Sequence, residues 1–140
     1  MIKNTPISDI MTREVISLNT TDQLERAEEI FKSRKIRHIP IVKNDKIVGM
    51  LSYTDLLRIS FADAYSGVMD EVESTVYEMF SLDQVMVKNP VSISSNQTIS
   101  DLADVFTKQE FHALPVVDNG RLVGIVTTTD LIRFMLGKLD

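Results

Sequence analysis

One ten-residue pattern occurs twice in this chain of 140 residues, at positions 49–58 and again at 124–133. In both copies an apolar run ends in hydroxyl-bearing residues, and an Asp, a short apolar segment and an Arg follow. The copies lie 75 residues apart, and this register holds without a gap from Ser8 and Asp83 to the two arginines. A constant offset of this kind indicates an internal repeat, so we expect two copies of one folding unit.

The first repeat is expected to alternate between strands and helices. Its β-branched and helically spaced apolar residues predict a strand at 15–18, a helix to Arg34, strands at 39–42 and 47–52, and a helix from Thr54 towards Gly67. The residues between the two later strands have turn chemistry, so those strands are expected to form a hairpin.

The second repeat has the same order of elements. We expect a strand at 91–93, a helix with apolar residues from Ile99 to Phe106, strands at 114–117 and 122–127, and a last helix reaching Leu139. Asn119 and Gly120 between the strands form the strongest hairpin signal in the chain. Both repeats therefore read β-α-β-β-α, which places the chain in the mixed α/β (α+β) class.

The repeats and the segment between them define three parts. We expect residues 1–62 to form the first repeat, 63–80 a helical linker and 81–140 the second repeat. Linker residues Met69, Val72 and Val76 have helical spacing among acidic neighbours, which indicates a helix with a solvated acidic face.

Composition narrows the function classes. The apolar and charged fractions, 44% and 25%, are typical of a folded soluble protein, and no apolar run is long enough to span a membrane. We expect a cytoplasmic protein without a secretory signal, since the first residues contain no apolar core segment. A net charge of −5 without a basic cluster argues against a nucleic-acid partner. The chain has no cysteine, no nucleophile–base pair and no phosphate-binding glycine loop, so we expect it not to be an enzyme.

The duplicated unit, each copy closing in Gly-x-x-[Ser/Thr]-x-x-Asp, resembles the cystathionine-β-synthase (CBS) domain in its tandem form, over residues 4–138. The resemblance implies two repeats packed about a pseudo-two-fold axis, with two clefts between them, and association of two chains into a flat homodimer. Such clefts commonly bind AMP, ADP, ATP, S-adenosylmethionine or NAD, and the module then signals to an attached or partner protein.

The resemblance assigns ribose recognition to Asp55 and Asp130, because a carboxylate accepts hydrogen bonds from two neighbouring hydroxyls. Ser52 and Thr127 match the hydroxyl that contacts phosphate or ribose in the family. Each Asp also stands three residues after its hydroxyl residue, as in a capping box, so a purely structural role is the alternative.

The other candidates surround these motifs. Thr54 and Thr129 precede the Asp residues at helix starts, where backbone N–H groups can face a phosphate. The family often has His or Arg that reach the phosphates just before the first hairpin strand, where this chain has Arg37, His38 and His112. The alternatives are a solvated surface charge for Arg37 and partly buried polar contacts for the two histidines. It holds adenine beside the first strand, which corresponds to Val15, Ile16, Val91 and Ile93; for most of these, ordinary core packing is the alternative. For the two histidines a metal site is not expected, since no carboxylate stands at ligand spacing.

Two details of charge complete the expectations. Arg58 and Arg133 follow the Asp residues by one helical turn, and we expect surface ion pairs there, with contact to a ligand phosphate as the alternative. The few cations favour AMP or ADP over a more highly charged ligand. Because Arg37-His38 in one repeat corresponds to His112-Ala113 in the other, we expect two sites of unequal affinity. The main functional alternative is a ligand-free dimerisation or docking module that uses the linker and the last helix.

Overall fold

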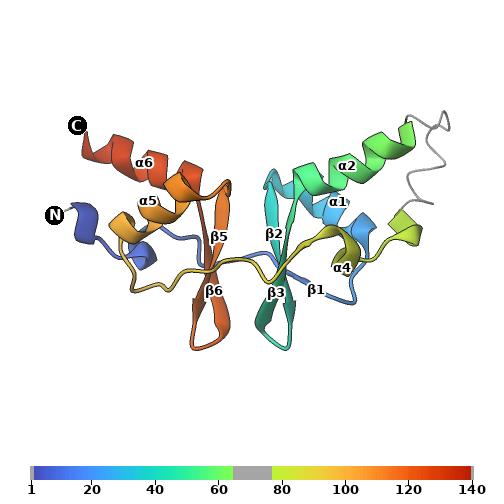
Figure 1. Cartoon of the computed structure of the whole chain (residues 1–140), viewed down its shortest axis with the longest axis horizontal. Coiled ribbons are helices and arrows are strands. Elements are labelled where there is room, and N and C mark those ends of the chain that lie inside the picture. The colour runs from blue at the N-terminus through green and yellow to red at the C-terminus, as the bar shows by residue number, and fades with distance from the viewer. Residues whose placement is uncertain (1, 65–76, 140) are drawn as a thin grey trace. The chain divides into compact units, whose positions relative to one another are not determined.

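The computed structural model describes residues 2–64 and 77–139, with side chains left out of the description for residues 60–64 (Figure 1). The chain divides into two compact units. We call residues 16–44 and 48–89 the first-hairpin unit, and residues 1–15, 45–47 and 90–140 the second-hairpin unit. The expected helical linker at 63–80 lies mostly outside the described residues, although residues 77–79 are helical.

The first-hairpin unit contains one four-stranded sheet with the strand order β1-β2-β3-β4. Its elements are β1 (Leu18–Asn19), α1 (Leu24–Arg34), β2 (His38–Lys43), β3 (Lys46–Ser52), α2 (Tyr53–Ala64), α4 (Leu82–Val85) and β4 (Val87–Lys88). Strand β1 runs parallel to β2, whereas β4 is antiparallel to β3. The sheet's two outer strands are thus its shortest.

The second-hairpin unit repeats this plan with less regular edges. Its elements are the 3₁₀ helices η1 (Ile2–Asn4) and η2 (Ile7–Asp9), then α5 (Ile99–Lys108), β5 (Ala113–Asp118), β6 (Arg121–Thr127) and α6 (Thr128–Lys138). Strands β5 and β6 are antiparallel, and single bridges join Ile93 to Val116 and Thr12 to Ile125. The mixed α+β class and the expected order of helices and hairpins are confirmed.

Both hairpin turns follow from residues that tolerate left-handed backbone. Asn44 and Asp45 have φ of 53° and 65°, and Asn119 and Gly120 have φ of 51° and 79°. Two successive positive φ values match the twist of antiparallel strands, and Asn, Asp and Gly adopt them at the lowest cost. The predicted turns are therefore confirmed.

The predicted first strand of each repeat is wrong in extent. Strand β1 begins only at Leu18, and of residues 91–93 only Ile93 forms a bridge. The cause lies in the neighbouring strand, where Ile93 N–H donates to the Pro115 carbonyl at 3.1 Å and Val117 N–H donates to the Ile93 carbonyl at 2.8 Å. The next parallel bond upstream would need an N–H on Pro115, which proline lacks. Pro40 holds the same place in β2.

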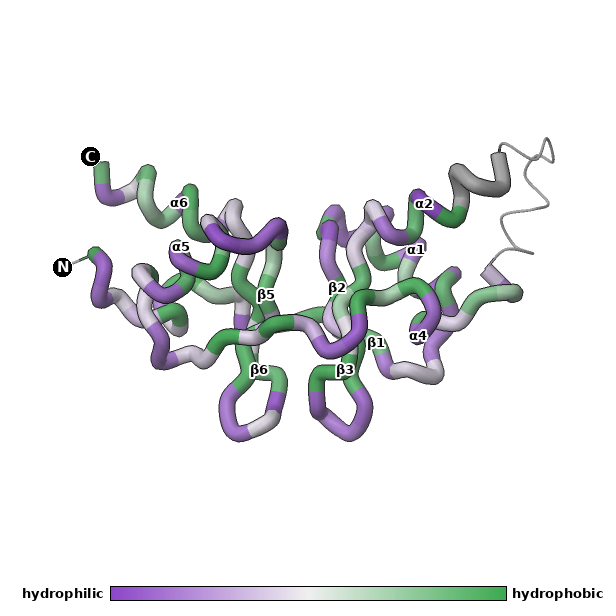
Figure 2. Tube along the Cα trace, in the orientation of Figure 1, coloured by the Kyte–Doolittle hydropathy of each residue, from purple (hydrophilic) through white to green (hydrophobic). Residues whose placement is uncertain are grey.

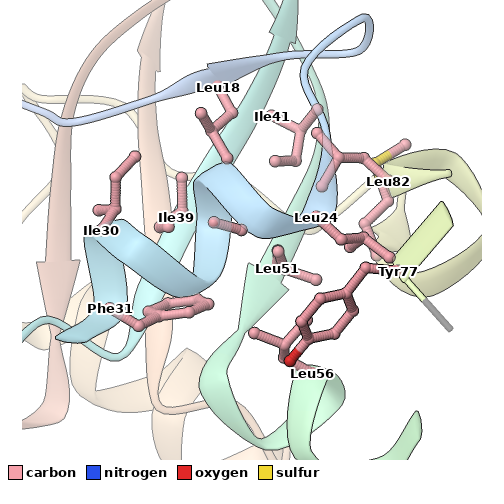
Figure 3. Packing of buried hydrophobic residues seen from close by; sticks show 12 residues of the cluster. Leu18, Leu24, Ile30, Phe31, Ile39, Ile41, Leu51, Leu56, Tyr77 and Leu82 are labelled. Carbon is pink, nitrogen blue, oxygen red and sulfur yellow. The ribbon is translucent and has the colours of Figure 1, made fainter. Parts of the chain in front are cut away.

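Each unit has its own apolar core. In the first-hairpin unit, α1 lays Leu24 and Phe31 against Ile39 and Leu51 of the sheet, and Leu24, Ile39 and Leu51 are fully buried (Figure 3). Burying one such side chain stabilises the fold by about 1.5–3 kcal/mol. In the second-hairpin unit the core consists of Ile7, Ile93, Leu102, Leu114, Val116 and Val126. Figure 2 shows the resulting pattern, with hydrophobic strands and hydrophilic hairpin tips.

In each unit a methionine packs against a glycine in the second strand of the hairpin. A Cβ placed on Gly49 of β3 would overlap Met86, whose Sδ lies over that backbone. In the second-hairpin unit a Cβ on Gly124 would lie 2.8 Å from Met11 Sδ and 2.9 Å from the Thr12 carbonyl oxygen. Both glycines and both methionines are 75 residues apart, so the contact is itself repeated. In each unit the methionine comes from the first residues of the other repeat.

We predict that Gly49→Ala and Gly124→Ala each lower the free energy of unfolding by about 1–3 kcal/mol, because an added Cβ overpacks the edge. Gly137→Ala is the matched control, since a Cβ there meets open space on α6. It should raise stability by about 0.5–1 kcal/mol through helix propensity. Urea unfolding measures all three. In the Met86→Ala background Gly49→Ala should cost less, and an unchanged cost would refute the contact.

Asp118, at the end of β5, fastens the turn after Ile93 to the sheet. It accepts hydrogen bonds from the Ser95 hydroxyl, from the Ser95 N–H at 3.0 Å and from the Ser94 hydroxyl at 2.9 Å. The bonds from Ser95, followed by the Ser94 hydroxyl, hold the pKa of Asp118 below its ordinary value near 3.8, against a smaller opposing effect of desolvation. The ionised form of Asp118 is therefore favoured in the folded state.

We predict that Asp118→Asn destabilises the fold at neutral pH and that its effect shrinks as the pH falls below about 4. A carboxyl with a lowered folded pKa contributes stability above its unfolded pKa and loses it as pH falls through the folded value. Urea unfolding of wild type and variant between pH 6 and pH 3 tests this, with the surface change Asp104→Asn as control. A gap between wild type and Asp118→Asn that is constant with pH would contradict it.

Candidate functional site

The repeated motif ends each hairpin and starts the helix that follows. At α2, Asp55 N–H donates to Ser52 Oγ at 3.1 Å, and Ser52 N–H donates to Asp55 Oδ2 at 3.1 Å. At α6, Asp130 N–H donates to Thr127 Oγ1 at 3.1 Å, and Thr127 N–H donates to Asp130 Oδ2 at 2.9 Å. Both expected capping boxes are thus formed, and each half-buried Asp has a structural role whatever else it does.

Capping occupies only one carboxylate oxygen of each Asp. The other oxygen of Asp55, Oδ1, lies 3.3 Å from Arg58 Nη1 and forms the expected ion pair. In the second repeat the corresponding pair is not formed, so that prediction is wrong there: among the described residues none donates to Asp130 Oδ1. Since each carboxylate oxygen can accept more than one hydrogen bond, Asp130 has the larger spare capacity.

A backbone hydrogen bond joins the start of each hairpin to the start of the following helix. Tyr53 N–H donates to the Arg37 carbonyl at 2.9 Å, and Thr128 N–H donates to the His112 carbonyl at 3.0 Å. The structure therefore brings Arg37 and His38 beside the α2 cap in the first-hairpin unit, and His112 beside the α6 cap in the second. The expected polar candidates form two sets at the same register.

These sets present donors and positive potential to solvent. Thr54, Thr129, Arg37 and His112 are exposed, whereas His38 is half-buried. The free N–H groups and aligned dipoles at the start of a helix favour an anion there by about 0.3–1 kcal/mol. The two sets can thus offer a carboxylate acceptor, hydroxyls and cationic side chains within one turn of a helix start.

The apolar candidates divide between core and surface. Ile93 is 3% exposed within the second core, and Ile16 packs on the first core, so ordinary core packing accounts for both. Val91 is 45% exposed, and Val15 is half-buried. Val91 is therefore the candidate that offers most apolar surface to a ligand.

Two further features bear on the kind of site. Within the described ranges, no three His, Cys, Asp or Glu side chains gather as they would around a metal ion. In the same ranges, no helix is both long and apolar enough to cross a membrane.

The structure also contains a pocket that the sequence did not predict. It has a volume of about 330 Å³ and lies in the first-hairpin unit. Its lining residues are Thr20, Lys43, Val48, Asp83, Met86, Lys88 and Asn89. The one signal that could have found it is a register difference, because Lys43 stands where the second repeat has Asp118.

With this geometry in view, the chain can be compared with known proteins. The uncharacterized protein MJ1232 of Methanocaldococcus jannaschii is 28% identical over 138 residues, which cover 98% of this chain and 42% of that protein. CBSX2 of Arabidopsis thaliana, solved in complex with AMP, has a TM-score of 0.80 at 22% identity and covers 97% of this chain and 99% of its own. The CBS domain pair of protein MJ0100 has a TM-score of 0.73 at 25% identity and covers 94% and 99%.

This chain corresponds to only part of several curated relatives. This chain spans between 22% and 48% of the length of five curated relatives, among them the inosine-5'-monophosphate dehydrogenase of Thermoplasma acidophilum. The family model of the CBS domain matches residues 7–62 and again residues 82–137. Because that model covers both repeats, the chain belongs to the CBS domain family and carries the domain twice.

Proposed function

We propose that this chain is a regulatory module that binds an adenosine compound beside the capped starts of α2 and α6 and passes the signal to a partner protein. The observation that carries the proposal is the repeated site: a capped Asp whose carboxylate has lone pairs beyond the one used in the cap, joined by backbone hydrogen bonding to a cationic or imidazole side chain. Two structures of this fold support it, CBSX2 in complex with AMP and MJ0100 with 5'-methylthioadenosine and S-adenosylmethionine.

The division of labour within each set follows from the chemistry of the groups. The 2'- and 3'-hydroxyls of a ribose would donate to the carboxylate, whose oxygens have lone pairs beyond those used in the cap. Phosphate or carboxylate groups of the ligand would lie at the helix start and at Arg37, His38 or His112. Val91, the most exposed of the apolar candidates, would lie beside the adenine in the second-hairpin unit.

The two sites differ in what they offer. The first set has two arginines, Arg37 and Arg58, beside His38, but Arg58 already pairs with Asp55. The second set has only His112 and Arg133, yet the Oδ1 atom of Asp130 has no donor among the described residues. We therefore propose that ribose binds more readily at Asp130 and that phosphates bind more readily in the first set. AMP or ADP then suits the chain better than a ligand with more charge.

Signalling needs a difference in affinity between two states. A ligand can shift a conformational equilibrium only by the ratio of its affinities for the two states, so tenfold tighter binding to one state is worth about 1.4 kcal/mol. We propose a regulatory rather than a catalytic role, because a chain without cysteine has no thiolate nucleophile and its carboxylates at these sites are engaged in caps.

We predict that the chain binds AMP saturably and that Asp130→Ala and Asp55→Ala each weaken binding at their own site by tenfold or more. Isothermal titration calorimetry with AMP, ADP, ATP, S-adenosylmethionine and NAD makes the measurement. The matched control is Asp101→Ala, because Asp101 closes the same capping box with Thr98 at the start of α5. All three variants should lose about 0.5–2 kcal/mol of stability.

The Asp101→Ala control distinguishes the loss of a helix cap from the loss of a ligand contact. If Asp101→Ala weakens AMP as much as Asp130→Ala does, the carboxylate acts only through the stability of a helix start. If none of the five compounds binds at millimolar concentration, the proposed function fails.

A second candidate is favoured by one surface. Helix α6 and the residue that caps its end expose four apolar side chains at i, i+3, i+4 and i+7: Ile132 is 57% exposed, Met135 42%, Leu136 58% and the capping residue Leu139 78%. Leu57, at the register of Ile132 in α2, is also 36% exposed. Apolar stripes of this kind commonly mark interfaces, and a self-complementary one suits a second copy of the same chain. We propose that α6 supports a homodimer.

We predict that the chain is a dimer at micromolar concentration and that Ile132→Lys with Leu136→Lys makes it monomeric, since two buried ammonium groups would be unpaired in the interface. Light scattering after size-exclusion chromatography gives the mass. Arg133→Gln, on the same helix between the two positions, should leave the dimer intact. A wild-type monomer at these concentrations would contradict the prediction.

A further inference from the structure

The pocket of the first-hairpin unit is separate from the proposed nucleotide sites. Strand β3 contributes Val48 to the pocket wall and ends at Ser52, so the two positions are about 13 Å apart along the strand. None of the residues matched to the family's ligand site is in the pocket wall. Its volume of about 330 Å³ lies at the lower end of the range for small-molecule sites.

The pocket wall is unusually rich in groups that bind anions. Lys43 and Lys88 bring two ammonium groups, and Thr20 and Asn89 bring a hydroxyl and an amide. Lys88 Nζ lies 3.4 Å from Asp83 Oδ2, so that pair is nearly neutral. Among the described residues no acid pairs with Lys43, which leaves one net positive charge in the wall.

The second repeat shows what the same position does with the opposite charge. Asp118 stands at the register of Lys43, and Ser95 at the register of Thr20. There the carboxylate of Asp118 is bound by the Ser95 N–H, the Ser95 hydroxyl and the Ser94 hydroxyl. In the second-hairpin unit the Asp118 carboxylate therefore lies against the turn at Ser94 and Ser95. In the first-hairpin unit a lysine, Lys43, stands at the same register.

The corresponding turn in the first-hairpin unit is closed by Asp22, whose Oδ2 accepts a hydrogen bond from the Asn19 N–H at 2.7 Å, whereas the bonds of Thr20 are longer. Thr20 N–H donates to the Val42 carbonyl at 3.3 Å, and the Thr20 hydroxyl lies 3.4 Å from Asn19 Oδ1. A bond of that length is weak, so the hydroxyl can turn to another acceptor at little cost. Asn89 is anchored by its own N–H, which donates to the Val48 carbonyl at 3.1 Å.

We infer that this pocket binds the oxyanion group of a small metabolite, a phosphate or a carboxylate, which takes the place that the Asp118 side chain fills in the second repeat. The oxyanion accepts hydrogen bonds from Lys43 and the Thr20 hydroxyl, with Lys88 and the Asn89 amide beside it. Charge-assisted bonds of this type are about twice as strong as neutral ones. The chain then has a third ligand site, independent of the adenosine sites and present in the first repeat alone.

The test is a titration of the ¹⁵N-labelled full chain with inorganic phosphate and, separately, with sodium acetate, at constant ionic strength set by chloride. We expect saturable amide shifts at Thr20, Lys43 and Asn89 with at least one of the two anions, and the anion that saturates identifies the phosphate or carboxylate class. Lys43→Asp, which installs the second repeat's carboxylate, should abolish these shifts. Lys46→Gln, on the same hairpin outside the pocket wall, should leave them unchanged.

Asp83→Asn gives a test in the opposite direction. Removing the one carboxylate in the wall should tighten binding by roughly fivefold at low salt, as expected for one unit charge a few ångströms away in water. The inference is overturned if neither anion saturates, if the shifts survive Lys43→Asp, or if they fall only on residues 52–55 and 127–130. The last outcome would reflect phosphate at the proposed adenosine sites, so failure of either proposal is recognised separately.

Discussion

The close approach of a methionine to a glycine is the constraint on which both units depend. Met86 lies against Gly49, and Met11 against Gly124, where any Cβ would overlap the thioether. In each contact, the first residues of one repeat pack on the sheet edge of the other. The edge strand β4 follows Met86 directly, and its residues Val87 and Lys88 pair with Met50 and Gly49 of β3. The helix starts at α2 and α6 depend on the same sheets, since β3 and β6 lead directly into them.

Much of this fold could be predicted, and the errors have identifiable causes. Helix α1, both hairpins and their left-handed turns follow from local periodicity and from Asn, Asp and Gly chemistry. The first strands were predicted too long because their pairing is cut short by a missing N–H on Pro115, a property of another strand. The packing of a methionine from one repeat on a glycine of the other could not be predicted, since local spacing contains no information on a contact between residues as distant as Met11 and Gly124.

The candidate site, like the fold, could be predicted in part. The capping boxes could be recognised in the sequence as Ser-x-x-Asp and Thr-x-x-Asp, and both are formed. The ion pair of Arg58 was predicted correctly and that of Arg133 was not, which fits the small energy of exposed pairs, about 0–1 kcal/mol. The pocket at Lys43 needed the structure, because Thr20 and Asn89 are far apart in sequence. The roles of the candidate ligand-binding residues stay predictions.

We propose that one repeated helix start serves both as a cap and as an adenosine site. An amide-resolved titration of the ¹⁵N-labelled chain with AMP tests this most directly, because caps and pocket report on separate amides. We expect saturable shifts at residues 52–55 and 127–130, with different midpoints at the two sites. Saturable AMP binding that leaves both stretches unchanged, or the absence of saturable binding, would contradict it.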